Sequence, residues 1–139
     1  MKKFYLDTSI WKDYFEDKKD NIKPLGEFAF QLLKKCEKNK WKVLYSEITI
    51  HELKNHYSDE RIKQVFSSFK DFIIFVSISA EQRLESKELA LKKDQTHSAD
   101  ILHSILARDN KAVMVTRDKH FEVLKDIFQV MKPEDIIFY

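Results

Sequence analysis

Glycine and cysteine are scarce in this sequence, and each shortage excludes a class of protein. Among 139 residues there is one glycine, Gly26, whereas phosphate-cradling loops need several so that the backbone approaches the ligand. The sequence therefore contains neither a Walker loop nor a dinucleotide-binding fingerprint, which excludes nucleotide-cofactor enzymes of those types. The one cysteine, Cys36, excludes an intrachain disulfide and a zinc cluster of thiolates, and it fits a reducing cytoplasm.

Long apolar runs and a large charge excess are missing as well. No segment approaches the ~20 apolar residues of a membrane-spanning helix, and Asp7 interrupts the N-terminus too early for a signal peptide. We therefore expect a cytoplasmic protein outside the membrane. The formal net charge is +2, from 25 basic and 23 acidic residues, whereas a protein that coats DNA is usually more basic. If RNA is the partner, positive charge must gather locally around an acidic site.

The sequence does contain enough apolar material for one core. Eleven Phe, five Tyr and two Trp in 139 residues indicate a single domain spanning residues 1–139. Short apolar runs alternate with longer amphipathic ones, which indicates an α/β fold with a mostly parallel central sheet. We expect strands at residues 4–6, 41–45, 71–76, 112–115 and 129–131, the third of them buried, and a terminal apolar run at 136–138. We expect helices capped by Thr8 or Ser9, starting near Pro24, and at 46–57, 59–70, 80–91, 97–108 and 121–125.

Four acidic residues from distant parts of the chain are expected to meet at one edge of this sheet. Asp7 follows the first strand and Asp118 follows a late one, while Glu52 lies in the helix after the second strand and Asp100 opens the helix before the late strand. Ligands of such sheets gather at the carboxyl ends of the strands. Carboxylates suit Mg²⁺ or Mn²⁺, which lower the pKa of a bound water and neutralise charge at a scissile phosphate.

Four segments resemble, in order, the motifs of the PIN-domain family. Each motif is weak alone, but their order and separations match over nearly the whole chain. They are Phe4-Tyr5-Leu6-Asp7-Thr8-Ser9, Ser46-Glu47-Ile48-Thr49-Ile50-His51-Glu52-Leu53, Ser98-Ala99-Asp100-Ile101-Leu102 and Val113-Met114-Val115-Thr116-Arg117-Asp118-Lys119-His120-Phe121.

The resemblance implies a three-layer fold, with the sheet sandwiched by helices, that is usually dimeric and carries metal-dependent ribonuclease activity. Many small single-domain members of the family that this chain resembles are VapC-type toxins, which an antitoxin protein holds inactive. Carried over by position, the metal ligands and catalytic residues are Asp7, Glu52 and Asp100, with Asp118 completing the site directly or through water. Hydroxyls that orient these carboxylates are those of Thr8 or Ser9, and Thr116.

One departure from the family pattern is visible before the late strand. Asn110-Lys111 stands where members often have a glycine. Asparagine tolerates left-handed backbone, so we expect the turn to persist.

Several residues near the motifs also have a purely structural interpretation. An acid after a strand is often only a helix cap, and Glu47 is explained by the helix dipole. His97, Asp100 and His103 share a helical spacing that suggests zinc, but the nearby acids favour a harder cation. Several basic residues near the motifs are placed to contact phosphates, although each is more often a solvated charge: Lys12, Lys54, Arg117, Lys119 and Lys125.

The leading hypothesis is thus a Mg²⁺- or Mn²⁺-dependent endoribonuclease that forms a homodimer, cleaves RNA and pairs with an antitoxin. One alternative is a catalytically silent PIN module, and another is a housekeeping RNA-processing nuclease. A third is a different aspartate-dependent phosphotransfer protein. A haloacid-dehalogenase-like phosphatase needs a second Asp where Ser9 stands, and a phospho-receiver needs an acidic pair that the N-terminus lacks.

Overall fold

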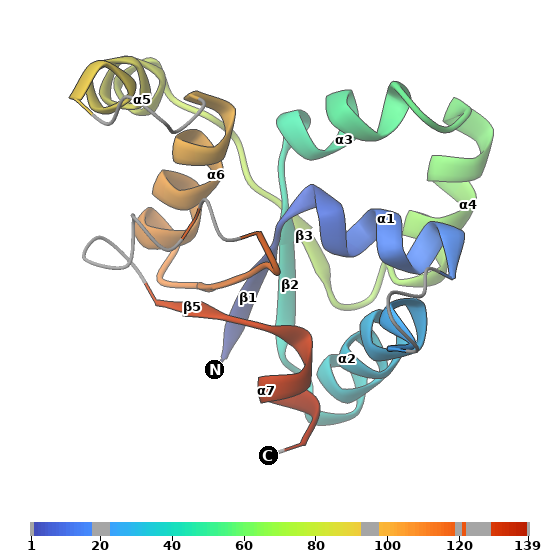
Figure 1. Ribbon diagram of the computed structural model, residues 1–139. Coiled ribbons are helices and arrows are strands. Elements are labelled where there is room, and N and C mark those ends of the chain that lie inside the picture. Colours follow the sequence, from blue (N-terminus) through green and yellow to red (C-terminus); the bar gives the residue numbers. More distant parts are fainter. Residues whose placement is uncertain (1, 18–22, 93–97, 119–120, 122–128, 139) are drawn as a thin grey trace.

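The computed structural model describes residues 2–17, 23–92, 98–118, 121 and 129–138 (Figure 1). A five-stranded sheet lies at its centre with the order β3-β2-β1-β4-β5, and every neighbouring pair is parallel. The strands are β1 (Lys3–Leu6), β2 (Lys42–Tyr45), β3 (Ile73–Phe75), β4 (Val113–Val115) and β5 (Val130–Met131). The predicted α/β fold with a parallel sheet is confirmed.

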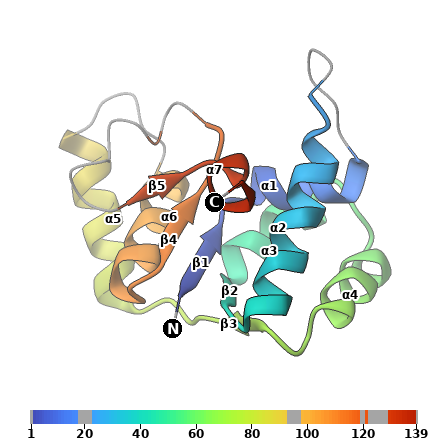
Figure 2. The ribbon, with the colours of Figure 1, turned by 90° about the horizontal axis from the view of Figure 1, so that it is seen from below.

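Helices lie on both sides of this sheet, as Figures 1 and 2 show from two directions. Helices α5 and α6 lie on one side, and α1, α2 and α4 on the other. No helix among the described residues is both long and apolar enough to cross a bilayer. The helices are α1 (Thr8–Glu16), α2 (Leu25–Asn39), α3 (Glu47–Lys54), α4 (Asp59–Ser68), α5 (Ala80–Lys92), α6 (Ser98–Asp109) and α7 (Pro133–Ile137).

Side chains of β1 alternate between two hydrophobic cores. Phe4 and Leu6 pack with Trp11 of α1 and its neighbours, whereas Tyr5 packs with Ile105 and other residues of α6 on the opposite face. Successive residues of a strand point to opposite faces, so a strand buried on both sides must be apolar throughout. The three-residue run before Asp7 satisfies this requirement, which places β1 in the middle of the sheet.

The strand order creates a switch point between β1 and β4. From β1 the chain proceeds outward to β2 and β3, then returns through α5 and α6 to β4 on the other side of β1. The carboxyl ends of the two strands are adjacent, and the Asp7 amide donates to the Val115 carbonyl at 2.9 Å. Crevices at such points are the usual ligand sites of parallel sheets.

Two sequence predictions about individual elements are wrong. Neither Thr8 nor Ser9 caps α1, because the helix already begins at Thr8 and Asp7 occupies the N-cap position. The apolar run at 71–76 forms an edge strand, with Ile74 39% and Phe75 51% exposed, because β3 has only one neighbour.

Other differences lie in the turn before β4 and at the C-terminus. The left-handed residue of the turn is Lys111, with φ 55°, and not Asn110. The terminal apolar run lies largely in α7, which starts at Pro133, a favourable first-turn residue. The short helix expected near 121–125 lies, apart from Phe121, outside the described residues.

Candidate metal and active site

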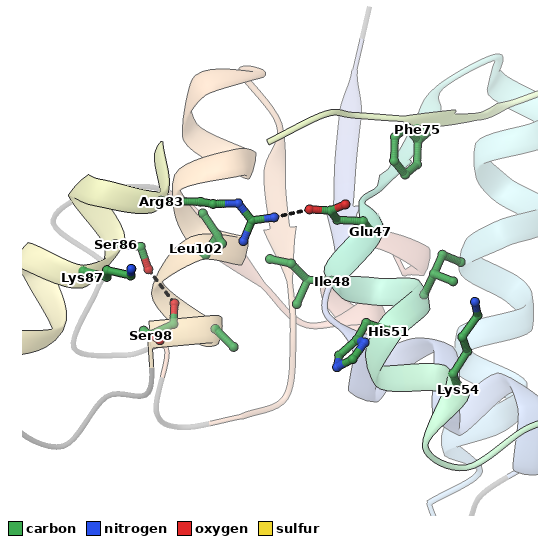
Figure 3. Close-up of a pocket in the computed structure, with 12 residues that line it drawn as sticks. Glu47, Ile48, His51, Lys54, Phe75, Arg83, Ser86, Lys87, Ser98 and Leu102 are labelled. Carbon is green, nitrogen blue, oxygen red and sulfur yellow. Dashed lines mark hydrogen bonds and ion pairs between the residues drawn. The ribbon is translucent and has the colours of Figure 1, made fainter. Parts of the chain in front are cut away.

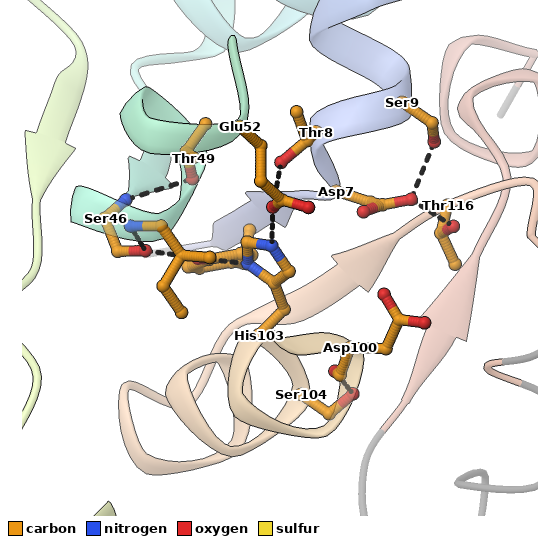
Figure 4. Close-up of polar contacts among 12 residues, drawn as sticks. Asp7, Thr8, Ser9, Ser46, Thr49, Glu52, Asp100, His103, Ser104 and Thr116 are labelled. Carbon is orange, nitrogen blue, oxygen red and sulfur yellow. Dashed lines mark hydrogen bonds and ion pairs between the residues drawn. The ribbon is translucent and has the colours of Figure 1, made fainter. Parts of the chain in front are cut away.

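Asp7 lies directly after β1 and is 6% exposed. Its Oδ2 accepts a hydrogen bond from Ser9 Oγ at 2.6 Å and another from Thr116 Oγ1 at 2.9 Å (Figure 4). Ser9 belongs to the first turn of α1 and Thr116 follows β4, so the donors come from both sides of the switch point. A buried carboxylate is costly without such partners. The two hydroxyls therefore fix the orientation of Asp7.

Glu52 projects from α3 toward the same edge of the sheet. The helix is set by Ser46, which directly follows β2 and whose side chain accepts a hydrogen bond from the Ile48 amide, as the sequence predicts. Glu52 Oε1 accepts from Thr8 Oγ1 at 2.9 Å and lies 2.6 Å from His103 Nε2. Burial opposes ionisation of Glu52, but these two hydrogen bonds and the electrostatic effect of His103 and His51 together outweigh it and hold the pKa of its carboxyl below the ordinary value.

A buried chain of hydrogen bonds leads to Glu52 from the other side of His103 (Figure 4). Tyr5 Oη lies 2.8 Å from Ser46 Oγ and 2.7 Å from His103 Nδ1, and His103 is fully buried. Burial raises the pKa of Tyr5, so its phenol stays protonated. One assignment of protons satisfies every group: the Ile48 amide donates to Ser46, Ser46 to Tyr5, and Tyr5 to Nδ1. In this assignment the Nε2–H of His103 donates to Glu52.

Asp100 is half-buried in the first turn of α6 and faces the other carboxylates. Burial and the charge of Asp7, followed by the charges of Asp118 and Glu52, raise the pKa of Asp100 above its ordinary value, and His103 offsets part of the effect. All four sequence-predicted acids are therefore close enough to interact electrostatically. They come from β1, α3, α6 and the segment after β4.

Thr116 connects two of these acids. Besides donating to Asp7, its Oγ1 accepts a hydrogen bond from the Asp118 amide at 3.0 Å. Thr116 is 3% exposed, so water competes little for either bond. One buried hydroxyl thus orients the Asp7 carboxylate and fixes the backbone that carries Asp118.

Arg117, between these two residues, points away from the site. Its Nη1 donates to Glu134 Oε2 at 2.8 Å, and its Nε lies 3.6 Å from Asp13 Oδ2. The side chain is only 19% exposed. The hypothesis that Arg117 contacts phosphates therefore gives way to a structural role, in which the ion pair fastens the end of β4 to α7. Lys119 and Lys125 lie outside the described residues.

The donor set suits a hard divalent cation, because it consists of carboxylate oxygens whose mutual repulsion a cation would relieve. In the part of the chain that the structure describes, however, no three His, Cys, Asp or Glu side chains are close enough to hold a metal ion together. Glu52 is bound to Thr8 and His103, and Asp7 to two hydroxyls. The chemistry of the four residues fits such an ion.

Sequence reasoning did not identify His103 and Tyr5 as part of this site. The helical spacing of His97, Asp100 and His103 suggests a role for His103 only as a zinc ligand, an interpretation that the nearby acids disfavour. Instead, His103 contacts Tyr5 and Glu52. His97 lies outside the described residues. The available signal is a histidine three residues after a site aspartate, within the mostly apolar stretch Ile101–Ala107 of the helix.

Comparisons with known proteins agree with the geometry. Residues 4–127 match the family described as PIN domain. No curated protein matches the sequence.

Solved structures share the fold at low sequence identity. VapBC2 from Rickettsia felis, solved bound to a DNA fragment from their promoter, matches with a TM-score of 0.68 at 17% identity, over 94% of this chain and 98% of that chain. A toxin–antitoxin complex from Klebsiella pneumoniae matches with a TM-score of 0.65 at 20% identity, over 93% of this chain and 96% of that chain. FitAcB from Neisseria gonorrhoeae matches with a TM-score of 0.60 at 17% identity, over 94% of this chain and 97% of that chain. At these identities the likeness concerns the fold.

Proposed function

This chain belongs to the PIN-domain family, and from that premise we propose that it is a metal-dependent endoribonuclease that hydrolyses RNA phosphodiester bonds. Asp7, Glu52 and Asp100 are the main ligands of Mg²⁺ or Mn²⁺, and Asp118 completes the site directly or through water. The same four carboxylates are the catalytic residues.

The observation that carries this proposal is that four carboxylates from distant parts of the chain gather at one edge of the sheet, where Asp7, Asp118 and Glu52 act on Asp100 and raise its pKa. A half-buried carboxyl beside Asp7, Asp118 and Glu52 is poorly placed to ionise alone. Structural sites usually pair such acids with Lys or Arg, whereas the partners of the described acids here are one another, hydroxyls and His103. A bound divalent ion supplies the missing positive charge, lowers the pKa of its water and neutralises charge at the phosphate.

The residues around the carboxylates position them. Ser9 and Thr116 hold Asp7, and Thr8 and His103 hold Glu52. Groups that hydrogen-bond a metal ligand fix its orientation and raise metal affinity. These contacts support a site whose ligands are oriented before the ion and RNA arrive.

We further propose that the protein is the toxin of a toxin–antitoxin pair, acts in the cytoplasm and forms a homodimer. Support comes from the fold likeness to VapBC2 and to the Klebsiella pneumoniae toxin–antitoxin complex, over nearly the full length of each. A housekeeping RNA-processing nuclease would have the same active site. Growth arrest on expression, relieved by co-expression of a neighbouring antitoxin gene, is the result expected of a toxin.

The enzymatic proposal is tested on a panel of structured RNAs with Mg²⁺, Mn²⁺ or EDTA. We expect cuts with a metal that disappear in EDTA and in Asp7→Asn. Circular dichroism of Asp7→Asn must match that of the wild type. Cleavage that survives both EDTA and the substitution would remove the assignment.

A silent PIN module is the second candidate, and one observation favours it. No three ligating side chains of the described residues stand ready to hold an ion. Calorimetry with Mn²⁺ separates the candidates, because a silent module of this kind shows no saturable binding, whereas the enzyme binds Mn²⁺ and loses that binding in Asp100→Asn.

A further inference from the structure

A cleft of about 700 Å³ lies between α3, the end of β3, α5 and α6, so the helices that carry Glu52 (α3) and Asp100 (α6) are among its walls (Figure 3). Its wall on α3 includes His51, the neighbour of Glu52 in sequence, and its wall on α6 includes Ala99, the neighbour of Asp100. His51 is also close enough to Glu52 to contribute to the lowering of its pKa. None of the four carboxylates lines the cleft itself, but a chain ligand longer than the cleft would pass from these walls toward Glu52 and Asp100.

The cleft carries positive charge where the active site carries negative charge. Lys54, Arg83 and Lys87 line it against one carboxylate, Glu47, which leaves a formal charge of +2 (three cations less one anion). Arg83 reaches from α5 to pair with Glu47 on α3, as Figure 3 shows, so this pair ties the two walls together. Lys54 lies 4.0 Å from Asp59 and remains 52% exposed. Lys54 and Lys87 are thus the cations available to a ligand.

Apolar side chains also line the cleft, and one of them is an aromatic ring. Among them are Ile48, Leu102 and Phe75, and Phe75 is 51% exposed at the carboxyl end of β3. The Phe75 ring packs edge-on against Tyr45, with the ring centroids 5.5 Å apart, which holds it in place. An exposed ring in a cleft that also holds cations suits single-stranded nucleic acid, because bases stack on the ring while cations contact phosphates.

We propose that this cleft binds the single-stranded RNA segment next to the scissile phosphate, with Lys54 and Lys87 on the backbone and Phe75 stacked on an unpaired base. The inference rests on the proposed ribonuclease function, since RNA is the ligand that the adjacent carboxylates would cut. A duplex is excluded from this mode, because its bases are not free to stack on Phe75. The local gathering of cations around an acidic site is what RNA binding by a chain of net charge +2 requires.

The test is fluorescence anisotropy with a fluorescein-labelled single-stranded RNA of mixed sequence, about 12 nucleotides long. It is performed in EDTA over a range of salt concentrations, so that no metal-dependent cleavage occurs. The double variant Lys54→Ala/Lys87→Ala is compared with Lys38→Ala/Lys70→Ala, which removes the same charge at exposed positions outside the cleft.

The cleft double variant should bind at least about tenfold more weakly than the wild type. Its slope of log affinity against log salt should be flatter by about 1.4, for two phosphate contacts of about 0.7 each. Phe75→Ala should weaken binding about tenfold with an unchanged slope, and Phe75→Trp should restore it. Melting temperatures near that of the wild type keep these readings independent of folding. No binding by the wild type, or equal losses in the cleft and control variants, would overturn the inference.

This result is separable from that of the proposed function. If no RNA is cut under any metal but the cleft variants lose binding, the cleft is supported and the nuclease is not. If RNA is cut normally and the cleft variants bind as the wild type does, the nuclease stands and the cleft assignment fails.

Discussion

His103 Nε2 and Glu52 Oε1 lie 2.6 Å apart, although 51 residues separate them in sequence. The contact joins α6 to α3, so the helix that carries Asp100 also orients the carboxylate of Glu52. Tyr5 of β1 supports His103 from its other nitrogen, at 2.7 Å. The buried imidazole of His103 therefore links Glu52 on α3 to the helix that carries Asp100.

Replacement of His103 tests this link. We expect His103→Leu to weaken Mn²⁺ binding about 10- to 100-fold, because Glu52 loses the donor that orients it. His103→Gln retains an N–H and should recover part of the affinity. Calorimetry measures both, with His56→Gln, an exposed histidine beyond the end of α3, as the control. Equal Mn²⁺ affinity in folded His103→Leu and wild type would show that Glu52 is positioned without the imidazole.

Thr116→Val removes one hydroxyl at nearly constant volume. Asp7 loses a donor at 2.9 Å and the Asp118 amide loses an acceptor at 3.0 Å, so we expect metal affinity and RNA cleavage to fall at least about tenfold. Thr116→Ser retains the hydroxyl and should stay near the wild type. The prediction fails if Val and Ser variants cleave RNA equally well.

The ion pair of Arg117 with Glu134 predicts a pH dependence of stability. Burial works against ionisation of Glu134, but the hydrogen bonds and charge of Arg117 outweigh it and place the pKa of Glu134 below its ordinary value. A carboxyl with a lowered pKa stabilises the fold fully above its unfolded pKa, about 4.3, and loses this contribution as pH falls through the folded pKa.

Glu134→Gln should therefore reduce the free energy of unfolding by about 1 kcal/mol at neutral pH. The difference from the wild type should shrink as the pH falls below the ordinary glutamate pKa. Urea unfolding in EDTA at several pH values measures this difference. A gap that stays constant down to acid pH would contradict the assigned charge state.

Gly26→Ala should destabilise the protein, although alanine favours helices by about 1 kcal/mol. A Cβ at this buried position of α2 would lie 2.7 Å from the carbonyl carbon of Asp17, which is backbone and cannot turn aside. We expect a loss of about 1 to 3 kcal/mol in urea unfolding. Ser67→Ala, exposed on α4, is the control and should leave stability unchanged. If Gly26→Ala had the same free energy of unfolding as the wild type, Asp17 would have to move away at no cost.

Local chemistry explains why much of this fold could be predicted from the sequence. Asp7 ends an apolar run, and Ser46 directly precedes an amphipathic segment, so the ends of β1 and β2 and the start of α3 follow from neighbouring residues. The four acids could be assigned to one edge because parallel strands end at the same side of a sheet.

Features that depend on distant partners could not be predicted in this way. The apolar run around Phe75 has the composition of a buried strand, and only the strand order places it at an exposed edge. The partner of His103 on the strand side, Tyr5, is 98 residues away. Lys54 and Lys87 face one cleft only because α5 packs beside α6 and opposite α3.

In our proposal Asp7, Glu52, Asp100 and Asp118 act together as one divalent-metal site for RNA cleavage. The Mn²⁺ concentration dependence of RNA cleavage, for the wild type and for folded Asp100→Asn, tests it most directly. We expect no cleavage in EDTA, saturable activation of the wild type by Mn²⁺, and loss of that activation in the variant. Cleavage independent of Mn²⁺, or activated equally in both proteins, would contradict the account.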